Sequence, residues 1–294
     1  LITGGGGFIG FHLAKSLLND GHKVTILENF IRGKKDQDFT KLVEQKDVNL
    51  IEGDITNHNT FTNLDDEYNA VFHFAAINGT ENFYKIPDKV LKVGILGTLN
   101  ILDWFVKKGN GKLIFASSSE AYAGTLKIMG DDFPIPTPED IPLTINNPAN
   151  TRWSYGGSKI LGELAFHAYS NAHGLSDWSI VRFHNIYGPR MGYEHVIPQM
   201  IERVINKEDP FVVFDSDATR SFCFIEDAVQ ALKLILKSKD TNKATINIGR
   251  SDGEIKISEL VEKIFSVANV SPEIINKAGP KGSVKRRCPN IDKL

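Results

Sequence analysis

Two kinds of hydrophobic pattern alternate along the first two thirds of the chain. Short apolar runs are typical of buried strands, and apolar positions spaced three or four apart are typical of helices. Strands that alternate with helices predict an α/β fold built on a doubly wound parallel sheet. The predicted strands cover residues 1–3, 23–28, 47–52, 70–76, 112–116 and 178–183, with clear helical patterns over 8–18, 89–107 and the residues after 153.

After residue 183 the predicted elements become shorter and more mixed, which indicates a second, smaller α/β lobe at the C-terminus. We divide the chain into 1–183 and 184–294, and expect it to cross between the lobes. The connection 123–152 is proline-rich and too long for an ordinary loop, so we expect it to border the functional site. The short elements predicted for the second lobe are helices over 194–206, 226–236 and 258–267 and strands over 211–214, 221–225 and 245–248.

A glycine-rich turn joins the first predicted strand to the first helix. Gly4, Gly7 and Gly10 follow that strand, and Glu28 ends the next one. Glycines in such a turn let the backbone approach a pyrophosphate, which the helix N-terminus then holds. A carboxylate at Glu28 can accept a hydrogen bond from a ribose 2′-hydroxyl and would repel a 2′-phosphate. We therefore predict a Rossmann-like domain that binds NAD in preference to NADP.

The next two strands end in residues that suit the same cofactor. Asp54 and Ile55 follow the third strand, where an adenine could pack on Ile55 and bond to Asp54. The small residues Ala75 and Ala76 end the fourth strand and allow a cofactor to pass close. The predicted cofactor contacts are Gly4, Gly7, Phe8, Ile9, Gly10, Glu28, Asn29, Asp54, Ile55, Ala75, Ala76, Tyr155 and Lys159.

Tyr155 and Lys159 are four residues apart and would share one face of a helix. A neighbouring ammonium group favours the phenolate and can lower a tyrosine pKa from about 10 towards neutrality. Such a phenolate is a general base for an alcohol. Ser118 lies at the carboxyl end of the fifth strand, where ligands of parallel sheets gather, so we expect it to meet Tyr155.

Composition and charge exclude several classes of protein. The chain has 294 residues and a formal net charge of -2, without the basic footprint of a nucleic-acid-binding protein. Its two cysteines form neither a disulfide framework nor a metal-binding spacing. We see no membrane-spanning run and no signal peptide, and we expect a cytoplasmic protein without a metal site. Because the chain begins at Leu1 without a methionine, we expect its first strand to be truncated.

Taken together, the motifs resemble the extended short-chain dehydrogenase/reductase family, the NAD-dependent nucleotide-sugar epimerases and dehydratases. The matching segments span nearly the whole chain in the order of that family. They are the glycine turn 3–10, the strand end 117–122, the Tyr155-to-Lys159 motif, the segment 182–190, Thr219-Arg220-Ser221-Phe222 and the segment 286–291.

The resemblance implies a role for each matched residue. Tyr155 would take the proton of a sugar hydroxyl, usually at C4, while hydride passes from C4 to NAD. Lys159 would lower the pKa of Tyr155 and hold the nicotinamide ribose, and Ser118 would bond the same hydroxyl. The family commonly forms homodimers through the helix bearing Tyr155 and the long helix before it. The implied contacts to a nucleotide-sugar substrate are Ser118, Ser119, Asn185, Arg190, Val196, Arg220 and Arg287.

The resemblance leaves the reaction open. Glu120 stands where 4,6-dehydratases of the family carry a glutamate base for C5, although Ser119 replaces the aspartate that many of them place before it. UDP-glucuronate decarboxylases share this pattern. A 4-epimerase needs only Tyr155, Lys159, Ser118 and NAD, and is our first hypothesis. A 4,6-dehydratase with Glu120 as the base and a UDP-glucuronate decarboxylase are alternatives, and a non-catalytic dinucleotide-binding protein is a remote one.

Overall fold

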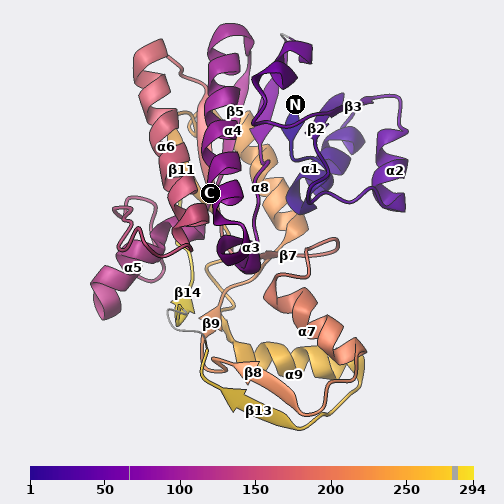
Figure 1. Cartoon of the computed structure of the whole chain (residues 1–294), viewed down its shortest axis with the longest axis vertical. Coiled ribbons are helices and arrows are strands. Elements are labelled where there is room, and N and C mark those ends of the chain that lie inside the picture. Colours follow the sequence, from indigo (N-terminus) through magenta and orange to yellow (C-terminus); the bar gives the residue numbers. More distant parts are fainter. Residues whose placement is uncertain (66, 280–283) are drawn as a thin grey trace.

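The computed structural model describes residues 1–65, 67–279 and 284–294, and shows a large lobe above a smaller one (Figure 1). A seven-stranded sheet forms the centre of the large lobe, in the order β11-β6-β5-β4-β1-β2-β3. Every neighbouring pair in it is parallel, as predicted. Its strands are β1 (Ile2–Thr3), β2 (Val24–Glu28), β3 (Val48–Glu52), β4 (Ala70–His73), β5 (Lys112–Ser118), β6 (Trp178–Phe183) and β11 (Ala244–Ile248).

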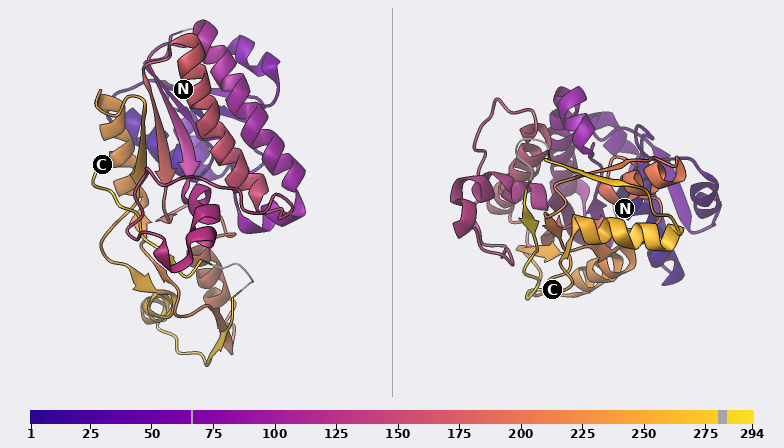
Figure 2. Two further views of the ribbon diagram at one scale, coloured as in Figure 1. Left: turned by 90° about the vertical axis from the view of Figure 1, so that its left-hand side faces the viewer. Right: turned by 90° about the horizontal axis from the view of Figure 1, so that it is seen from below.

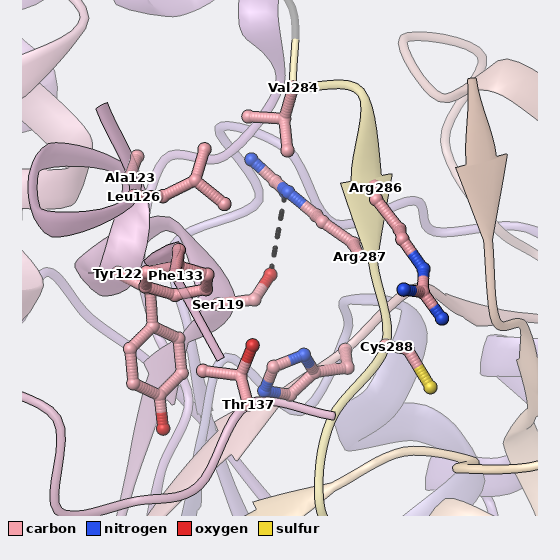
Figure 3. Close-up of a pocket in the computed structure, with 11 residues that line it drawn as sticks. Ser119, Tyr122, Ala123, Leu126, Phe133, Thr137, Val284, Arg286, Arg287 and Cys288 are labelled. Carbon is pink, nitrogen blue, oxygen red and sulfur yellow. Dashed lines mark hydrogen bonds between the residues drawn. The ribbon is translucent and has the colours of Figure 1, made fainter. Parts of the chain in front are cut away.

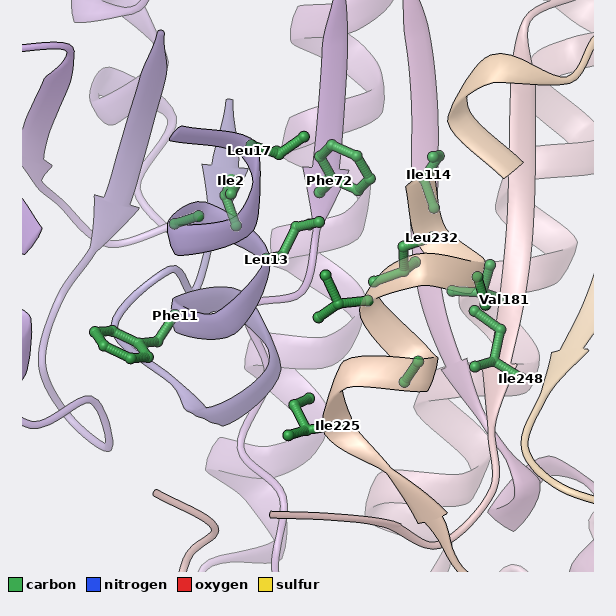
Figure 4. Packing of buried hydrophobic residues seen from close by; sticks show 14 of the residues in the cluster. Ile2, Phe11, Leu13, Leu17, Phe72, Ile114, Val181, Ile225, Leu232 and Ile248 are labelled. Carbon is green, nitrogen blue, oxygen red and sulfur yellow. The ribbon is translucent and has the colours of Figure 1, made fainter. Parts of the chain in front are cut away.

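Helices cover both faces of this sheet, so the fold is doubly wound. On one face, side chains from α1 and α8 pack against the strands (Figure 4). On the other face, α4 and α6 bury a second apolar cluster and lie side by side (Figure 2). The helices of this lobe are α1 (Phe8–Asn19), α2 (Gln37–Val43), α3 (Thr80–Lys85), α4 (Pro87–Lys108), α6 (Trp153–His173) and α8 (Ile225–Lys237).

The structure corrects our assignment of α8 and β11, which we had predicted to belong to the small lobe. β11 extends the large sheet by pairing in parallel with β6, with Ala244 opposite Ser179. Ile246 and Ile248 of β11 lie in the same buried cluster as Val181. Local hydrophobic patterns predict that a strand exists, but they do not say which sheet it joins. The large lobe therefore takes elements from both parts of the chain.

The small lobe has an apolar core of its own, centred on residues such as Phe211, Val261 and Phe265. The connection 123–152 contains α5 (Ala123–Met129) and lies where the two lobes meet (Figure 1). The remaining elements are β7 (Ile186–Tyr187), α7 (Val196–Ile205), β8 (Phe211–Phe214), β9 (Thr219–Arg220), β10 (Cys223–Phe224), β12 (Ile255–Lys256), α9 (Ile257–Ala268), β13 (Ile274–Lys277) and β14 (Arg286–Arg287).

The close packing of α4 on α6 places the start of α6 beside the end of β5. Gly94 of α4 faces Ser158 of α6 so closely that a Cβ at Gly94 would lie 2.5 Å from the Ser158 Oγ. Only a residue without a side chain permits this approach. Ser158 lies between Tyr155 and Lys159, so this contact helps to determine where both side chains lie.

Candidate active site

The structure brings Tyr155, Lys159 and Ser118 together at the carboxyl end of β5, as predicted. The Tyr155 ring is buried and stacks on Phe83, with ring centroids 4.8 Å apart, and its hydroxyl hydrogen-bonds to Ser118. The Lys159 ammonium donates to the Ala116 carbonyl at 2.7 Å and lies 5.5 Å from the centre of the Tyr155 ring. The helical spacing of four therefore places both side chains on the buried face of α6.

The effect that we expected of Lys159 on Tyr155 is not what the structure shows. Burial raises the pKa of Tyr155 to about 12, and the hydrogen bond from Ser118 lowers it only in part. Burial also lowers the pKa of Lys159 to about 8, against the opposing charge of Glu163. The spacing gave no measure of burial, and burial opposes the charged form of both groups. The chain by itself therefore holds Tyr155 as a neutral phenol.

Glu120 lies between two arginines in the same site. Its carboxylate pairs with Arg152 at 2.7 Å and with Arg287 at 2.6 Å, and Arg287 also reaches the Ser119 hydroxyl at 3.5 Å. Burial would raise the pKa of Glu120, but the charges of Arg287 and Arg152 outweigh it and lower the pKa to about 2. Glu120 is therefore ionised at neutral pH and a weak base, whereas a C5 base needs a pKa near the working pH.

This ion pairing predicts a specific response to acid. Because the pKa of Glu120 is depressed, its contribution to stability is complete above its ordinary value of 4.5 and is lost as the pH falls towards about 2. We expect the free energy of unfolding to fall by roughly 1–2 kcal/mol more in the wild type than in Glu120→Gln between about pH 5 and about pH 3. Urea unfolding at several pH values measures this difference. The prediction would be contradicted if the free energy of unfolding depended on pH equally in both proteins.

Arg220 and Asn185, two of the predicted substrate contacts, lie on neighbouring segments below the site. The Arg220 guanidinium donates to the carbonyls of Val284 and Thr219, each at 2.7 Å. Burial and the nearby charge of Arg287 lower the pKa of Arg220 to about 10. The Asn185 amide donates to the Ser221 carbonyl at 3.1 Å. Their contact with a diphosphate stays a prediction, as does that of Val196 at the start of α7.

Arg190, another of the predicted substrate contacts, contacts the large lobe. Its guanidinium stacks over the Phe11 ring at 4.0 Å and forms an ion pair with Asp36, so it joins the small lobe to α1 and to the segment after β2. The motif placed Arg190 near the substrate by its position in the sequence alone. The positive φ of Arg190, at 68°, accompanies the turn at this position. The contact of Arg190 with a substrate stays a prediction.

The glycine turn fits the backbone of a dinucleotide. A Cβ at Gly10 would lie 2.4 Å from the Gly4 carbonyl oxygen, and one at Gly4 would lie 2.8 Å from the Ala75 backbone, so side chains here would force the turn apart. Gly7 is the N-cap of α1, and Phe8 and Ile9 form its first turn. Free backbone N–H groups at a helix N-terminus suit a pyrophosphate. The chain therefore offers the site that NAD requires.

The acid that ends β2 and its surroundings favour NAD over NADP. Glu28 is buried at the rim of the glycine turn, and the Asn29 amide next to it donates to Asp54 at 3.3 Å. Of the nearby cations, Arg32 pairs with Glu194, Lys35 pairs with Glu52, and Lys34 lies over the Tyr193 ring at 5.0 Å. Two further predicted contacts, Ala75 and Ala76, are half-buried just beyond β4, and their approach to the cofactor stays a prediction.

Ile55, another of the predicted cofactor contacts, is buried. Only 4% of its surface is exposed, and it packs on α4 opposite Gly97. Its contact with an adenine stays a prediction.

Three residues of the site escaped the sequence analysis: Arg152, Phe83 and His184. Arg152 comes directly before α6, and a search for cations flanking the Tyr155 motif would have found it. His184 borders a small pocket beside the catalytic groups, which Ser119 and Arg287 also line (Figure 3). Burial lowers the pKa of His184 to about 3, and its Nδ1 atom has no partner among the described residues.

Comparisons with known proteins show the family of the chain. The family model described as the NAD dependent epimerase/dehydratase family matches residues 1–249. A UDP-N-acetyl-alpha-D-glucosaminuronate decarboxylase of Bacillus cytotoxicus is 36% identical over the whole chain and 89% of its own length. UDP-glucuronic acid decarboxylase 5 of Arabidopsis thaliana is 32% identical over the whole chain and 81% of its own length. The structure of a UDP-glucose 4-epimerase of Thermotoga maritima with UDP-glucose has a TM-score of 0.84 at 25% identity, covering 99% of this chain and 89% of that one.

The chain therefore belongs to the NAD-dependent epimerase/dehydratase family, and it is an enzyme that uses NAD. When bound, oxidised NAD supplies a hydride acceptor and a positively charged ring. The residues of this chain that would hold it are those of the glycine turn together with Glu28 and Lys159. Among the described residues, no helix is both long and apolar enough to span a membrane.

Proposed function

We propose that this enzyme oxidises C4 of a nucleotide-linked hexuronic acid and releases its carboxyl group as carbon dioxide. The observation that carries the proposal is the ion pairing of Glu120 with Arg152 and Arg287 beside Tyr155. The decarboxylase relatives, which match over the full length of this chain, support it.

The ionised state of Glu120 separates the candidate reactions. A 4,6-dehydratase must remove the proton from C5, and a carboxylate with a pKa of about 2 is poorly suited to that step. Decarboxylation requires no base at C5, because the carbon–carbon bond to the carboxylate breaks instead. A ketone at C4 makes this bond labile, since the electron pair left on C5 is delocalised into the carbonyl. The pair is then protonated at C5.

The charges of the site suit a substrate with several negative groups. Arg287 lies close enough to Arg220 to lower its pKa, and Arg152 adds a third positive charge beside Glu120. Asp215 and Glu254 are the other carboxylates near Arg220. Arginine binds carboxylates and phosphates through paired, charge-assisted hydrogen bonds. We assign the uronate carboxylate to Arg287, which lies beside Ser119, and the diphosphate to Arg220 and Asn185.

The remaining groups move the proton of the C4 hydroxyl. Ser118 accepts from the Glu120 backbone N–H at 3.2 Å, which orients its hydroxyl at the end of β5. Tyr155 takes the proton of the C4 hydroxyl when C4 is oxidised, either directly or relayed by the Ser118 hydroxyl. It returns the proton when C4 is reduced. Lys159 contributes a positive charge below the ring of Tyr155. The net reaction consumes the nucleotide-linked hexuronate and one proton, and yields a nucleotide-linked pentose and carbon dioxide.

A 4-epimerase, our first hypothesis from the sequence, is the second candidate. It requires only Tyr155, Lys159, Ser118 and NAD, all of which the site provides. The fold is also similar to that of the Thermotoga maritima UDP-glucose 4-epimerase. In that case Glu120 would serve only to hold Arg152 and Arg287 in place.

One assay tests both candidates. The enzyme and NAD are incubated with UDP-glucuronic acid, UDP-2-acetamido-2-deoxyglucuronic acid, UDP-glucose and UDP-N-acetylglucosamine, and the products are followed by mass spectrometry and NMR. Loss of carbon dioxide from either acid is the expected result. An unchanged mass with a new configuration at C4 would establish the epimerase, and loss of water would establish a dehydratase. A lack of turnover with every sugar would overturn both proposals.

We also propose that the enzyme is a homodimer formed through α4 and α6. Leu91 on α4 and Leu161 and Leu164 on α6 are exposed on adjacent helices, where a partner would cover them. Replacing Leu164, which is 62% exposed, with glutamate should then yield monomers in light scattering.

We also propose that the enzyme is cytoplasmic. Its two cysteines are buried and free, which is typical of proteins in a reducing compartment.

A further inference from the structure

We propose that Gly6 and Gly33, which lie outside the three-glycine motif, are positioning residues for cofactor recognition. The structure assigns them this role because they make room for the side chain of Glu28. The inference depends on the use of NAD by the enzyme and not on which sugar reaction it catalyses.

The carboxylate of Glu28 is held by three backbone N–H groups. Its Oε2 accepts from Gly6 at 3.0 Å, and its Oε1 accepts from Asn29 and from Phe30, each at 3.0 Å. Phe30 has a positive φ of 56°, which is uncommon for a residue with a side chain. These bonds orient a flexible glutamate before any cofactor arrives, and leave a lone pair on Oε2 for a ribose hydroxyl.

The two glycines flank this carboxylate at close range. A Cβ at Gly6 would lie 3.0 Å from the Glu28 Cγ and 3.1 Å from its Oε2. A Cβ at Gly33 would lie 3.0 Å from the Glu28 Cδ and 3.1 Å from the same oxygen. Neither glycine is among those with a positive φ, so the backbone itself would accept alanine. The contact with Glu28 is therefore the main obstacle to a side chain at Gly6.

A methyl group at either position would displace a carboxylate that has little freedom to move. A shift of a few tenths of an ångström would stretch its bond to the Gly6 N–H and turn it away from the ribose. The same carboxylate attracts a 2′-hydroxyl and repels a 2′-phosphate. Its displacement should therefore weaken NAD binding and relax the exclusion of NADP together, which a general loss of structure would not do.

The test measures the affinity of the cofactor-free enzyme for NAD and NADP by titration calorimetry. We expect Gly6→Ala to weaken NAD binding by up to about tenfold, as for the loss of one hydrogen bond, and to lower the ratio of the NADP and NAD dissociation constants. Glu28→Asp shortens the side chain by one methylene. The double variant Gly6→Ala/Glu28→Asp should therefore bind NAD more tightly than Gly6→Ala alone. Glu52→Asp, at the paired position of the neighbouring strand, is the matched control.

Two results would overturn the proposal: wild-type cofactor affinities in Gly6→Ala, or a double variant in which the two losses simply add. Thermal unfolding without cofactor shows whether Gly6→Ala is folded. If it is not, Gly33→Ala applies the same test from the other side of the carboxylate, and unchanged selectivity there would likewise reject the idea. Because the measurement is cofactor binding, it stays informative if the decarboxylase proposal fails.

Discussion

Replacing Tyr155 with phenylalanine is expected to lower kcat by about a thousandfold, within the range that general acid–base groups contribute. The substitution removes the hydroxyl that bonds to Ser118 but keeps the ring that stacks on Phe83. The fold and the NAD site should therefore remain. Turnover of the best substrate from the assay above, measured with saturating NAD, gives the ratio of the two rates.

The pKa of Tyr155 adds a second readout to this prediction. Burial raises that pKa to about 12 in the chain alone, so little phenolate forms at neutral pH and the fraction grows as the pH rises. We expect Tyr155→Phe to remove any rise of activity with pH that the wild type shows. Tyr84→Phe, at an exposed tyrosine, is the matched control and should keep full activity. A Tyr155→Phe enzyme with more than a tenth of wild-type activity would rule out this residue as the proton acceptor.

Replacing Arg182 with methionine is expected to lower the free energy of unfolding by about 3–5 kcal/mol, the usual effect of breaking a buried ion pair. Arg182 and Glu163 are each about 95% buried and form two hydrogen bonds, of 2.9 Å and 2.6 Å. Among the described residues, the substitution would leave the buried Glu163 charge with a hydrogen bond from Ser117 and the charge of Lys159. Urea unfolding of both proteins measures the difference.

Two further variants test the cause of this loss. Arg182→Met/Glu163→Leu removes both charges and should regain most of the stability, because an apolar pair can replace a buried ion pair. Arg250→Met breaks an exposed pair with Asp252 and should leave the free energy of unfolding almost unchanged, because solvent screens an exposed pair. If Arg182→Met lost no more than Arg250→Met, the buried pair would not contribute as described.

Local patterns in the sequence identified most elements of the large sheet and part of the site. The glycine turn, the acid that ends β2 and the spacing of Tyr155 and Lys159 depend on residues close together in the chain. Hydrophobic periodicity and turn residues report this local order. They placed the boundaries less well: β4 ends at His73 rather than at residue 76.

Partners distant in the sequence could not be found in this way. Nothing local indicates that Glu120 would meet Arg287, or that Arg190 would turn towards Phe11 and Asp36. The pairing of β11 with β6 could not be predicted for the same reason, because strand order depends on how the whole chain packs.

The sequence by itself determined the fold class, the cofactor and the pair Tyr155 and Lys159, since each follows from spacing within one or two elements. Only the tertiary structure decided the electrostatic state of the site. Burial makes Tyr155 a weaker acid than its spacing from Lys159 suggests, and two arginines from distant segments hold Glu120 ionised. The physical reason is that a pKa depends on desolvation and on charges nearby in space, and both arise only when the chain has folded.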